Sequence, residues 1–421
     1  MRDHEVGVDE RSPGALIQAG AVAGLLTLVL ALVWIGVHRS PDQSTPPGPR
    51  PSEVYPVREV WGPVHSTSAN VSHFTFRDVH RSGSWDVDDR PMAGIAVRML
   101  APDGTQTIRR SNIHGFVNFT NSLSASPVDV RAPGEYVFEV IIPPGWELTS
   151  ANAIQTGVYE SAPESRPGIV VDRVPEPAGL APILSVEGRV VTSEARTGTG
   201  TGGAPRVEAV TPAGDVVPIV LEPDGSFRFP AHEGAWRVRV RDPDRGDWTE
   251  REITVGRAPV RMAAIVPGQA YMPRGSVRRV VDFEDVTGSP ITKMPNGYAG
   301  LRWTNLVPVD NEMYSGEGYV NNTVSGTYVA YNTSGYPVSI EADEPFDFVG
   351  GYFGVAWAAA EGELLEVRAW RGQELTADET LILSALGPLW FDADFRGITK
   401  LELSTRHHWQ FVADDLEFAF R

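Results

Sequence analysis

The sequence of 421 residues contains no cysteine. This absence excludes disulfide bonds, thiolate metal centres and any thiol nucleophile. A hydrophobic content of 42% is enough to build packed cores. The folded parts of the chain must therefore be stabilised by apolar packing, with bound metal ions as the remaining candidate for a cross-link.

Basic residues are too few to balance the acidic ones, and the formal net charge is −18. A nucleic-acid partner needs a basic surface that attracts phosphates, so we expect no nucleic acid to bind. The same acidity keeps an exposed protein soluble and offers oxygen ligands to calcium.

Familiar catalytic motifs are missing as well. The sequence has no His-Glu-x-x-His, no Gly-x-Ser-x-Gly and no Walker loop. Its one histidine pair, His407 and His408, is adjacent in sequence, and neighbours on a strand point to opposite faces. We therefore predict that the chain is not an enzyme. A glycoside hydrolase is a weaker alternative that stays open. Its catalytic carboxylate pair is brought together by folding, so no sequence spacing reveals it.

One long uncharged apolar run stands out, residues 14–37. As a helix rising about 1.5 Å per residue it spans about 36 Å, enough to cross a hydrocarbon core of about 30 Å. A buried soluble helix would need a partner helix, and no such segment is nearby. A cleaved signal peptide has an apolar core of only about 7–15 residues. We therefore predict a single-pass transmembrane helix.

The orientation of this helix follows from what flanks it. Arginines are balanced between its two sides, so the positive-inside rule does not decide. Residues 1–13 form a short polar tail, whereas the C-terminal part has the patterns of exported β modules. We expect the tail to be cytoplasmic and the bulk to be extracellular or periplasmic. Residues 38–56 are rich in proline and predict an extended linker.

Residues 57–182 show short strands broken by turns. The expected strands are 73–78, 95–101, 106–110, 117–120 and 136–142. Turn signals separate them at Asp103-Gly104 and Pro133-Gly134. Residues 151–182 contain several prolines and few apolar pairs, and we expect a connecting strand and a linker there.

An ordered set of motifs in this region is typical of one module class. The motifs are Gly94-Ile95-Ala96-Val97, Asp103-Gly104, Gly115-Phe116-Val117-Asn118-Phe119, Pro133-Gly134-Glu135-Tyr136 and Pro144-Gly145-Trp146. Over about residues 74–150 the chain resembles an SdrD B-like or Cna-B-like module, which implies a β-sandwich. Some relatives carry an isopeptide bond that needs a lysine. This stretch has none, so that cross-link is excluded.

The resemblance also implies an EF-hand-type loop with calcium ligands. The matching carboxylates here are Asp78, Asp86 and Asp89, which supply hard oxygen donors. His80 stands where the family usually has Asp or Asn, and imidazole is a poor calcium ligand. A structural calcium ion and a solvated acidic turn are the two alternatives for this loop.

Residues 183–266 form a second β module by their strand and turn pattern. Gly188-Arg189-Val190 opens it, and Asp224-Gly225-Ser226-Phe227-Arg228-Phe229 follows. It resembles the carboxypeptidase regulatory-like, transthyretin-like β-sandwich, which implies a spacer.

Residues 267–421 form a third module that begins with VVDFEDV and ends with FVADDLEFAF. Over about residues 274–421 it resembles a jelly-roll domain of bacterial exported proteins. That resemblance implies neighbouring first and last strands, which would bring Glu284 and Asp285 close to Asp414 and Asp415. Carboxylates brought together repel unless a cation joins them or their pKa values rise. We therefore predict a structural calcium ion at this seam, with exposure of the carboxylates to water as the alternative.

Aromatic residues are frequent in the third module. Exposed aromatic rings stack on sugars, so a glycan-binding surface would use the side chains of Tyr298, Trp303, Tyr319 and Tyr331. The alternative is that aromatics fill the core, as they commonly do in sandwiches.

Together these patterns predict an all-β protein of three β-sandwich modules in tandem (two Ig/transthyretin-like, one jelly roll) behind one N-terminal transmembrane helix. The expected function is that of a membrane-anchored, surface-displayed, non-enzymatic adhesion or structural protein with a distal binding module. The partner would be a glycan or a cell-envelope protein. A polysaccharide-binding, lectin-like protein is the main alternative.

Overall fold

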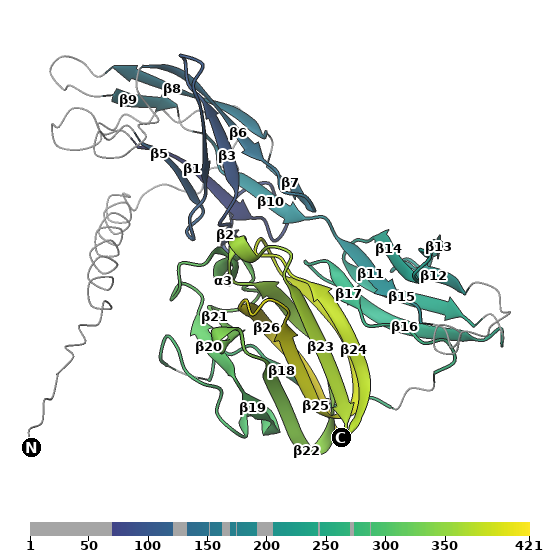
Figure 1. The fold of residues 1–421 in the computed structure, drawn as a ribbon. Helices are drawn as coiled ribbons and strands as arrows, with labels where there is room; N and C mark the ends of the chain where they lie inside the picture. The colour runs from purple at the N-terminus through teal and green to yellow at the C-terminus, as the bar shows by residue number, and fades with distance from the viewer. Residues whose placement is uncertain are drawn as a thin grey trace, which may run out of the picture. The chain divides into compact units, whose positions relative to one another are not determined.

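The computed structural model describes residues 70–120, 133–150, 152–161, 169–173, 175–191, 205–242, 245–269, 273–286 and 288–421 (Figure 1). These residues all belong to one compact unit, residues 54–421. The predicted tail, transmembrane helix (residues 14–37) and linker (residues 38–56) lie outside the described residues. Within the described ranges, no helix is both long and apolar enough to cross a bilayer.

The first module packs two five-stranded sheets face to face. One sheet contains β1 (Asn70–Arg77), β2 (Arg90–Pro91), β5 (Phe116–Thr120), β7 (Trp146–Leu148) and β10 (Ala178–Pro182). The other contains β3 (Ala96–Leu100), β4 (Gln106–Arg110), β6 (Gly134–Ile141), β8 (Ile154–Ser161) and β9 (Ile169–Arg173). The strands expected from the sequence over residues 73–142 are confirmed, with ends that differ by a few residues at most.

The core of this module lies between the two sheets. Alternation along β6 turns Tyr136 and Phe138 inward, where they meet Phe119 of β5 and Leu180 of β10. Rings of Phe119 and Phe138 lie 5.5 Å apart. Residues 151–182 differ from the expected strand and linker, since they supply β8, β9 and β10. The apolar side chains of β10 complete the core beside β1.

The second module is also two-layered. Its strands are β11 (Ser185–Arg189), β12 (Arg206–Val210), β13 (Val216–Ile219), β14 (Ser226–Pro230), β15 (Gly234–Arg241), β16 (Trp248–Val255) and β17 (Val260–Met262). One sheet has the order β13-β12-β15-β16, and β14-β11-β17 faces it. Along β16 exposed and buried residues alternate at every position, which is the pattern of a strand with one face on a core.

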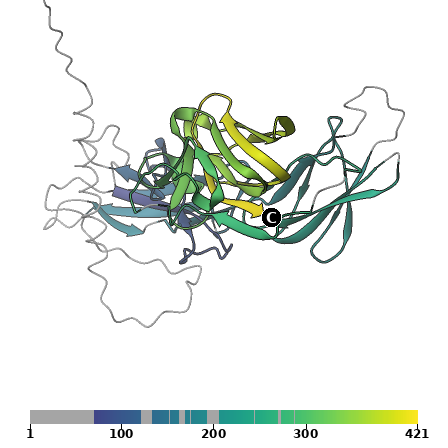
Figure 2. The same ribbon diagram turned by 90° about the horizontal axis from the view of Figure 1, so that it is seen from below.

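The third module is built around two very long strands. Its elements are β18 (Val277–Val281), β19 (Arg302–Thr304), β20 (Leu306–Asp310), α3 (Glu317–Asn321), β21 (Tyr328–Asn332), β22 (Val338–Val355), β23 (Leu364–Arg371), β24 (Glu374–Ile382), β25 (Leu389–Thr405) and β26 (Phe411–Phe420). Register shifts between Glu341 and Gly350 interrupt the β22–β25 pairing, so each long strand contributes to two layers. The green-to-yellow strands in Figures 1 and 2 show these layers, with the largest core between them (Figure 2).

Two pairings in this module bear on the sequence predictions. β18 runs antiparallel beside β26, so the expectation that the first and last strands are neighbours is confirmed. β17 pairs in parallel with β25, from Val260–Trp390 to Met262–Asp392. The second and third modules therefore share one 12-stranded sheet and are not separate sandwiches in tandem.

Candidate functional site

The acidic loop between β1 and β2 is closed by its own backbone. Asp78 is buried and accepts hydrogen bonds from the amides of Ser82 at 3.0 Å and Gly83 at 2.7 Å. Asp89 is also buried and accepts from the amides of Val79 at 2.8 Å and Asp86 at 2.9 Å. Backbone amides thus satisfy Asp78 and Asp89, two of the three carboxylates for which the family resemblance implies calcium. The third, Asp86, accepts from the amide of Asp88 at 3.2 Å.

His80 has a structural role at the position where the family resemblance places a ligand. Its Nδ1 accepts a hydrogen bond from Arg257 at 3.3 Å, and its Nε2 lies 2.8 Å from Asp88. Since a guanidinium only donates, this arrangement requires the tautomer with the proton on Nε2. Both ring nitrogens of His80 are occupied, which leaves none to activate a nucleophile.

The second acidic region binds the loop before β21. Buried Asp414 accepts from the amides of Val324 at 2.7 Å and Ser325 at 3.1 Å, and Asp415 accepts from the Ser325 hydroxyl at 2.7 Å. Burial, and then the neighbouring charge of Asp415, raises the pKa of Asp414 to about 8. Burial also raises the pKa of Asp415, and the charge of Glu284 adds to this rise.

Only part of the predicted seam converges. Glu284 accepts from the amides of Thr327 at 2.7 Å and Tyr328 at 2.6 Å, whereas Asp285 accepts from the Tyr298 hydroxyl. In the described ranges, no three His, Asp or Glu side chains form a group that could hold a metal ion. Calcium at either acidic region stays a prediction.

The aromatic residues proposed for glycan stacking lie mainly in cores. Trp303 packs in the largest core, and its indole nitrogen donates to the carbonyl of Tyr298 at 2.9 Å. Tyr319 and Tyr331 belong to a smaller aromatic core, with rings 5.8 Å apart. Only Tyr298 is partly exposed. Trp303, Tyr319 and Tyr331 are therefore not available to stack on a sugar, and the core alternative holds for them.

A set of hydrogen bonds fixes the first module to the third. Arg77, at the end of β1, donates to the carbonyl oxygens of Asn321 at 2.8 Å and Thr323 at 2.6 Å. The buried side chain of Asn321 accepts from the Ala93 amide at 2.9 Å and donates to the carbonyls of Ala93 at 3.0 Å and Ala385 at 2.9 Å. The side-chain amide of Asn321 therefore ties the segment between β2 and β3, and the loop before β25, to α3.

A buried ion-pair network joins the second module to the third. Arg251 of β16 pairs with Asp392 of β25, and both side chains are almost fully buried. Asp394, two residues along β25, accepts from Arg274 at 2.6 Å. Burial raises the pKa of Asp392, and the charge of Arg251 opposes that rise. The network adds to the β17–β25 pairing and fixes the joint between these modules.

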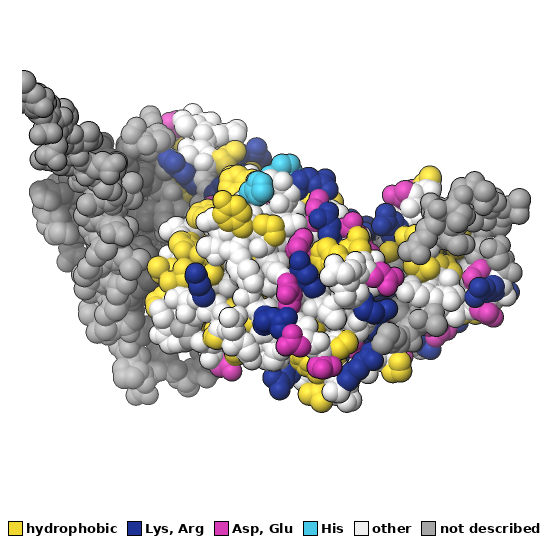
Figure 3. All heavy atoms as spheres, turned by 60° about the horizontal axis from the view of Figure 1, so that its bottom comes forward, with side chains coloured by type: hydrophobic (Ala, Val, Ile, Leu, Met, Phe, Trp, Pro, Cys, Tyr) yellow, Lys and Arg dark blue, Asp and Glu magenta, His cyan; other side chains and the backbone are white. Residues whose placement is uncertain are grey.

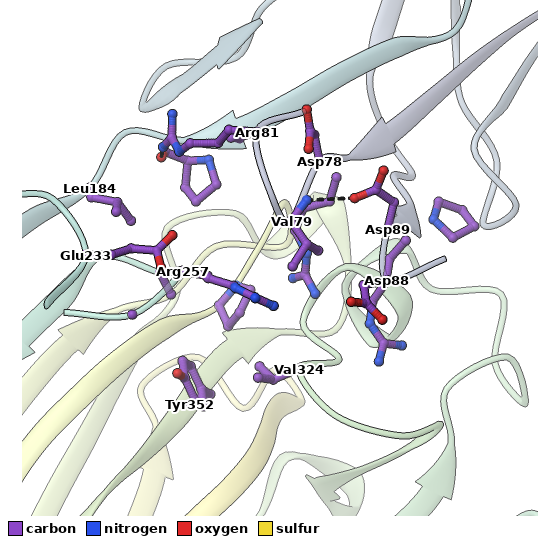
Figure 4. Close-up of a pocket in the computed structure, with 18 of the residues that line it drawn as sticks. Asp78, Val79, Arg81, Asp88, Asp89, Leu184, Glu233, Arg257, Val324 and Tyr352 are labelled. Carbon is purple, nitrogen blue, oxygen red and sulfur yellow. Dashed lines mark hydrogen bonds between the residues drawn. The ribbon is translucent and has the colours of Figure 1, made fainter. Parts of the chain in front are cut away.

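Where the three modules meet, they line a cavity of about 670 Å³ that is open to solvent (Figure 4). The acidic loop and Arg90 line it from the first module, Glu233, Gly256 and Arg257 from the second, and Tyr352 from the third. Figure 4 shows Arg257 between the loop that carries Asp88 and the strand that carries Tyr352. We call this space the junction cavity.

Arginines give the junction cavity its character. Burial, and then the positive charge of Arg90, lowers the pKa of Arg77 to about 10. The negative charge of Asp414 opposes this shift, and the charge of Arg257 adds to it. Arg90 and Arg257 thus both lie within electrostatic range of Arg77. On the outer face drawn in Figure 3, by contrast, basic and acidic side chains alternate without a continuous basic surface.

Sequence reasoning missed this cavity. Arg77, Arg257 and Tyr352 come from three modules and carry no shared motif. The one signal available was His80, the departure from the calcium-loop pattern, since it contacts Arg257.

Comparisons with known proteins give only distant similarity. No family model matches the sequence, and no curated protein matches it. Among solved structures, the Bacillus anthracis TIE protein is 8% identical with a TM-score of 0.20, over 80% of this chain and 44% of that one. BcpA, the major pilin subunit of Bacillus cereus, is 10% identical with a TM-score of 0.19, over 78% of this chain and 99% of that one.

A third similar structure comes from carbohydrate-binding modules of the β-sandwich superfamily. It is 9% identical with a TM-score of 0.18, over 70% of this chain and 95% of that one. Pilin, adhesin and carbohydrate-binding β-sandwich domains are thus the kinds of structure that the chain is similar to. At these TM-scores none assigns a family, and the three module resemblances stay predictions.

Proposed function

We propose that this chain is a surface-displayed, non-enzymatic adhesion protein whose ligand occupies the junction cavity. The observation that carries the proposal is the cavity itself, which three modules line together. Its volume lies within the range of about 300–1,000 Å³ that is usual for sites that bind small ligands. Hydrogen bonds of Arg77 and Asn321 and the ion pair of Arg251 hold its walls, so little ordering is needed on binding.

Gly256 allows a direct test of this proposal. A Cβ atom at this position would meet only the Tyr352 hydroxyl, at 3.6 Å, so a larger side chain fits the backbone and extends into the cavity. We expect Gly256→Trp to weaken ligand binding more than tenfold, whereas Gly256→Ala leaves it within about twofold. Binding is measured by calorimetry with the full chain in detergent, against a panel of glycans and cell-envelope polymers. Equal binding by the Gly256→Trp variant and the native protein would place the ligand elsewhere.

Surface display rests on the apolar run at residues 14–37. Cells that express the full chain should lose its signal when intact cells are treated with protease, and the chain should fractionate with membranes. Replacing three leucines of the run, Leu25, Leu26 and Leu28, with arginine should release the chain from the membrane fraction. A native chain found in the soluble fraction would overturn the anchoring.

A rigid spacer is the second candidate function, and the shared sheet of the second and third modules favours it. A chain that binds nothing in the panel, in both the native and Gly256→Trp forms, would support the spacer over the binding protein.

A further inference from the structure

Three guanidinium groups around the junction cavity lack a carboxylate partner. Among the described residues, none of Arg77, Arg90 and Arg257 forms an ion pair within 4.0 Å. Arg77 donates to two backbone carbonyls, Arg90 to the carbonyl of Gly326 at 3.0 Å, and Arg257 to His80 at 3.3 Å. Arg81 differs, because it pairs with Glu147. Clustered like charges repel, and a bound anion would relieve that repulsion.

The carboxylates that line the same cavity are engaged elsewhere, with one exception. Asp78 and Asp89 accept backbone amides of their own loop. Asp88 lies against His80, whose hydrogen bond is the main cause of the lowered pKa of Asp88, and the charges of Arg257 and Arg90 add to that lowering. Glu233 is exposed at the wall formed by the second module and makes no ion pair among the described residues. Arg77 is committed to its two carbonyls, whereas Arg90 and Arg257 each make one hydrogen bond among the described residues and keep further N–H groups for a ligand. The cavity therefore offers two cationic donors and one free acceptor.

Tyr352 adds a polar group of a different kind. Its ring is largely buried, and its hydroxyl faces Gly256, without a hydrogen-bond partner among the described residues. Hydroxyl groups both donate and accept hydrogen bonds. Together, the Tyr352 hydroxyl and the Glu233 carboxylate suit a ligand that carries hydroxyl groups in addition to its charge.

We infer that the junction cavity binds an acidic saccharide, whose anionic group is held by Arg257 and Arg90 and whose hydroxyls meet Tyr352 and Glu233. A planar guanidinium group can form a bidentate pair with a carboxylate or sulfate, in which two N–H groups donate to two oxygens. The volume of about 670 Å³ exceeds what a single inorganic ion needs and fits an organic ligand. This inference rests on the proposed binding function of the cavity.

The test compares Arg257→Gln with Arg228→Gln. Arg257 is exposed, so we expect its replacement to leave the fold intact, and thermal unfolding of the variant checks this. Arg228 is a matched control, since it is an exposed arginine of the same module paired with Glu187 and outside the cavity lining. The probes are oligogalacturonate, a neutral galactose oligomer, and inorganic sulfate and phosphate. We expect Arg257→Gln to weaken oligogalacturonate binding about tenfold or more, and Arg228→Gln to leave it unchanged.

The possible outcomes separate this inference from the proposed function. Weaker oligogalacturonate binding at high salt, with no binding of the neutral oligomer, supports the inference. Equal binding by native and Arg257→Gln proteins, abolished in Gly256→Trp, overturns the acidic ligand but keeps the cavity as a binding site. If the neutral oligomer binds as tightly as oligogalacturonate, the acidic ligand is likewise overturned and the cavity is kept as a binding site. Binding of sulfate or phosphate alone overturns the saccharide. Binding that Gly256→Trp does not affect overturns both proposals.

Discussion

Replacing Arg251 with methionine should destabilise the fold strongly. The side chains of Arg251 and Asp392 are 5% and 10% exposed, so water cannot compensate the carboxylate that is left behind. Removing one partner of a buried ion pair costs about 3–5 kcal/mol. The matched control is Arg228→Met, whose pair with Glu187 is 63% and 38% exposed, and whose loss should cost less than about 1 kcal/mol. Urea unfolding at constant pH measures both values.

The pH dependence of this loss gives a sharper test. Without Arg251, the pKa of Asp392, which burial already raises, rises further. The folded variant then binds a proton that the unfolded chain releases above about pH 4, so its stability falls as the pH increases. The difference between native and Arg251→Met proteins should therefore be larger at pH 8 than at pH 5. An equal difference at both pH values, or a loss as small as that of Arg228→Met, would refute this account of the network.

Three further predictions concern other parts of the chain. Burial lowers the pKa of His73 from 6.5 to about 4, so the unfolded state binds a proton first as the pH falls. Stability should drop by about 3 kcal/mol between pH 6.5 and 4, and His73→Leu should remove that part of the slope in denaturation curves; unchanged slopes would contradict it. Asn321→Ala should lower the free energy of unfolding by about 2–4 kcal/mol, because buried groups of Ala93 and Ala385 lose their hydrogen-bond partners. Calorimetry should then show the first module unfolding at a lower temperature. A single transition at an unchanged temperature would count against this prediction. If calcium binds the loop of residues 78–89, millimolar calcium should raise the unfolding temperature and Asp86→Asn should abolish the rise, whereas no shift in the native protein would remove calcium from that loop.

The local sequence pattern predicted the strands of this protein better than it predicted the functional sites. Residues 106–110 were expected to form a strand and do so, because turn residues and alternation are read directly from neighbours in sequence. Local pattern did not predict which aromatic side chains are buried. Trp303 and Tyr319 lie on short elements, and packing against distant strands decides which side of them is covered.

Contacts between modules were beyond the reach of the sequence. Arg77 ends a strand and would be assigned to solvent by its type, but its guanidinium meets carbonyls about 245 positions away. The acidic residues at the two ends of the third module were expected to meet because the first and last strands pair. They were not expected to bind backbone amides of the loop at residues 324–328. Such contacts depend on how whole modules pack together, and the local periodicity of a sequence does not predict that packing.

The parallel pairing of β17 with β25 has a practical consequence for anyone who divides this chain. A cut near residue 266, between the second and third modules by sequence pattern, separates Val260–Met262 from Trp390–Asp392. Each fragment would then expose an open strand edge, and on the β25 side that edge carries Trp390 and Phe391. Open apolar edges pair with other copies, so fragments divided there should aggregate. The second and third modules must therefore be expressed and handled as one piece.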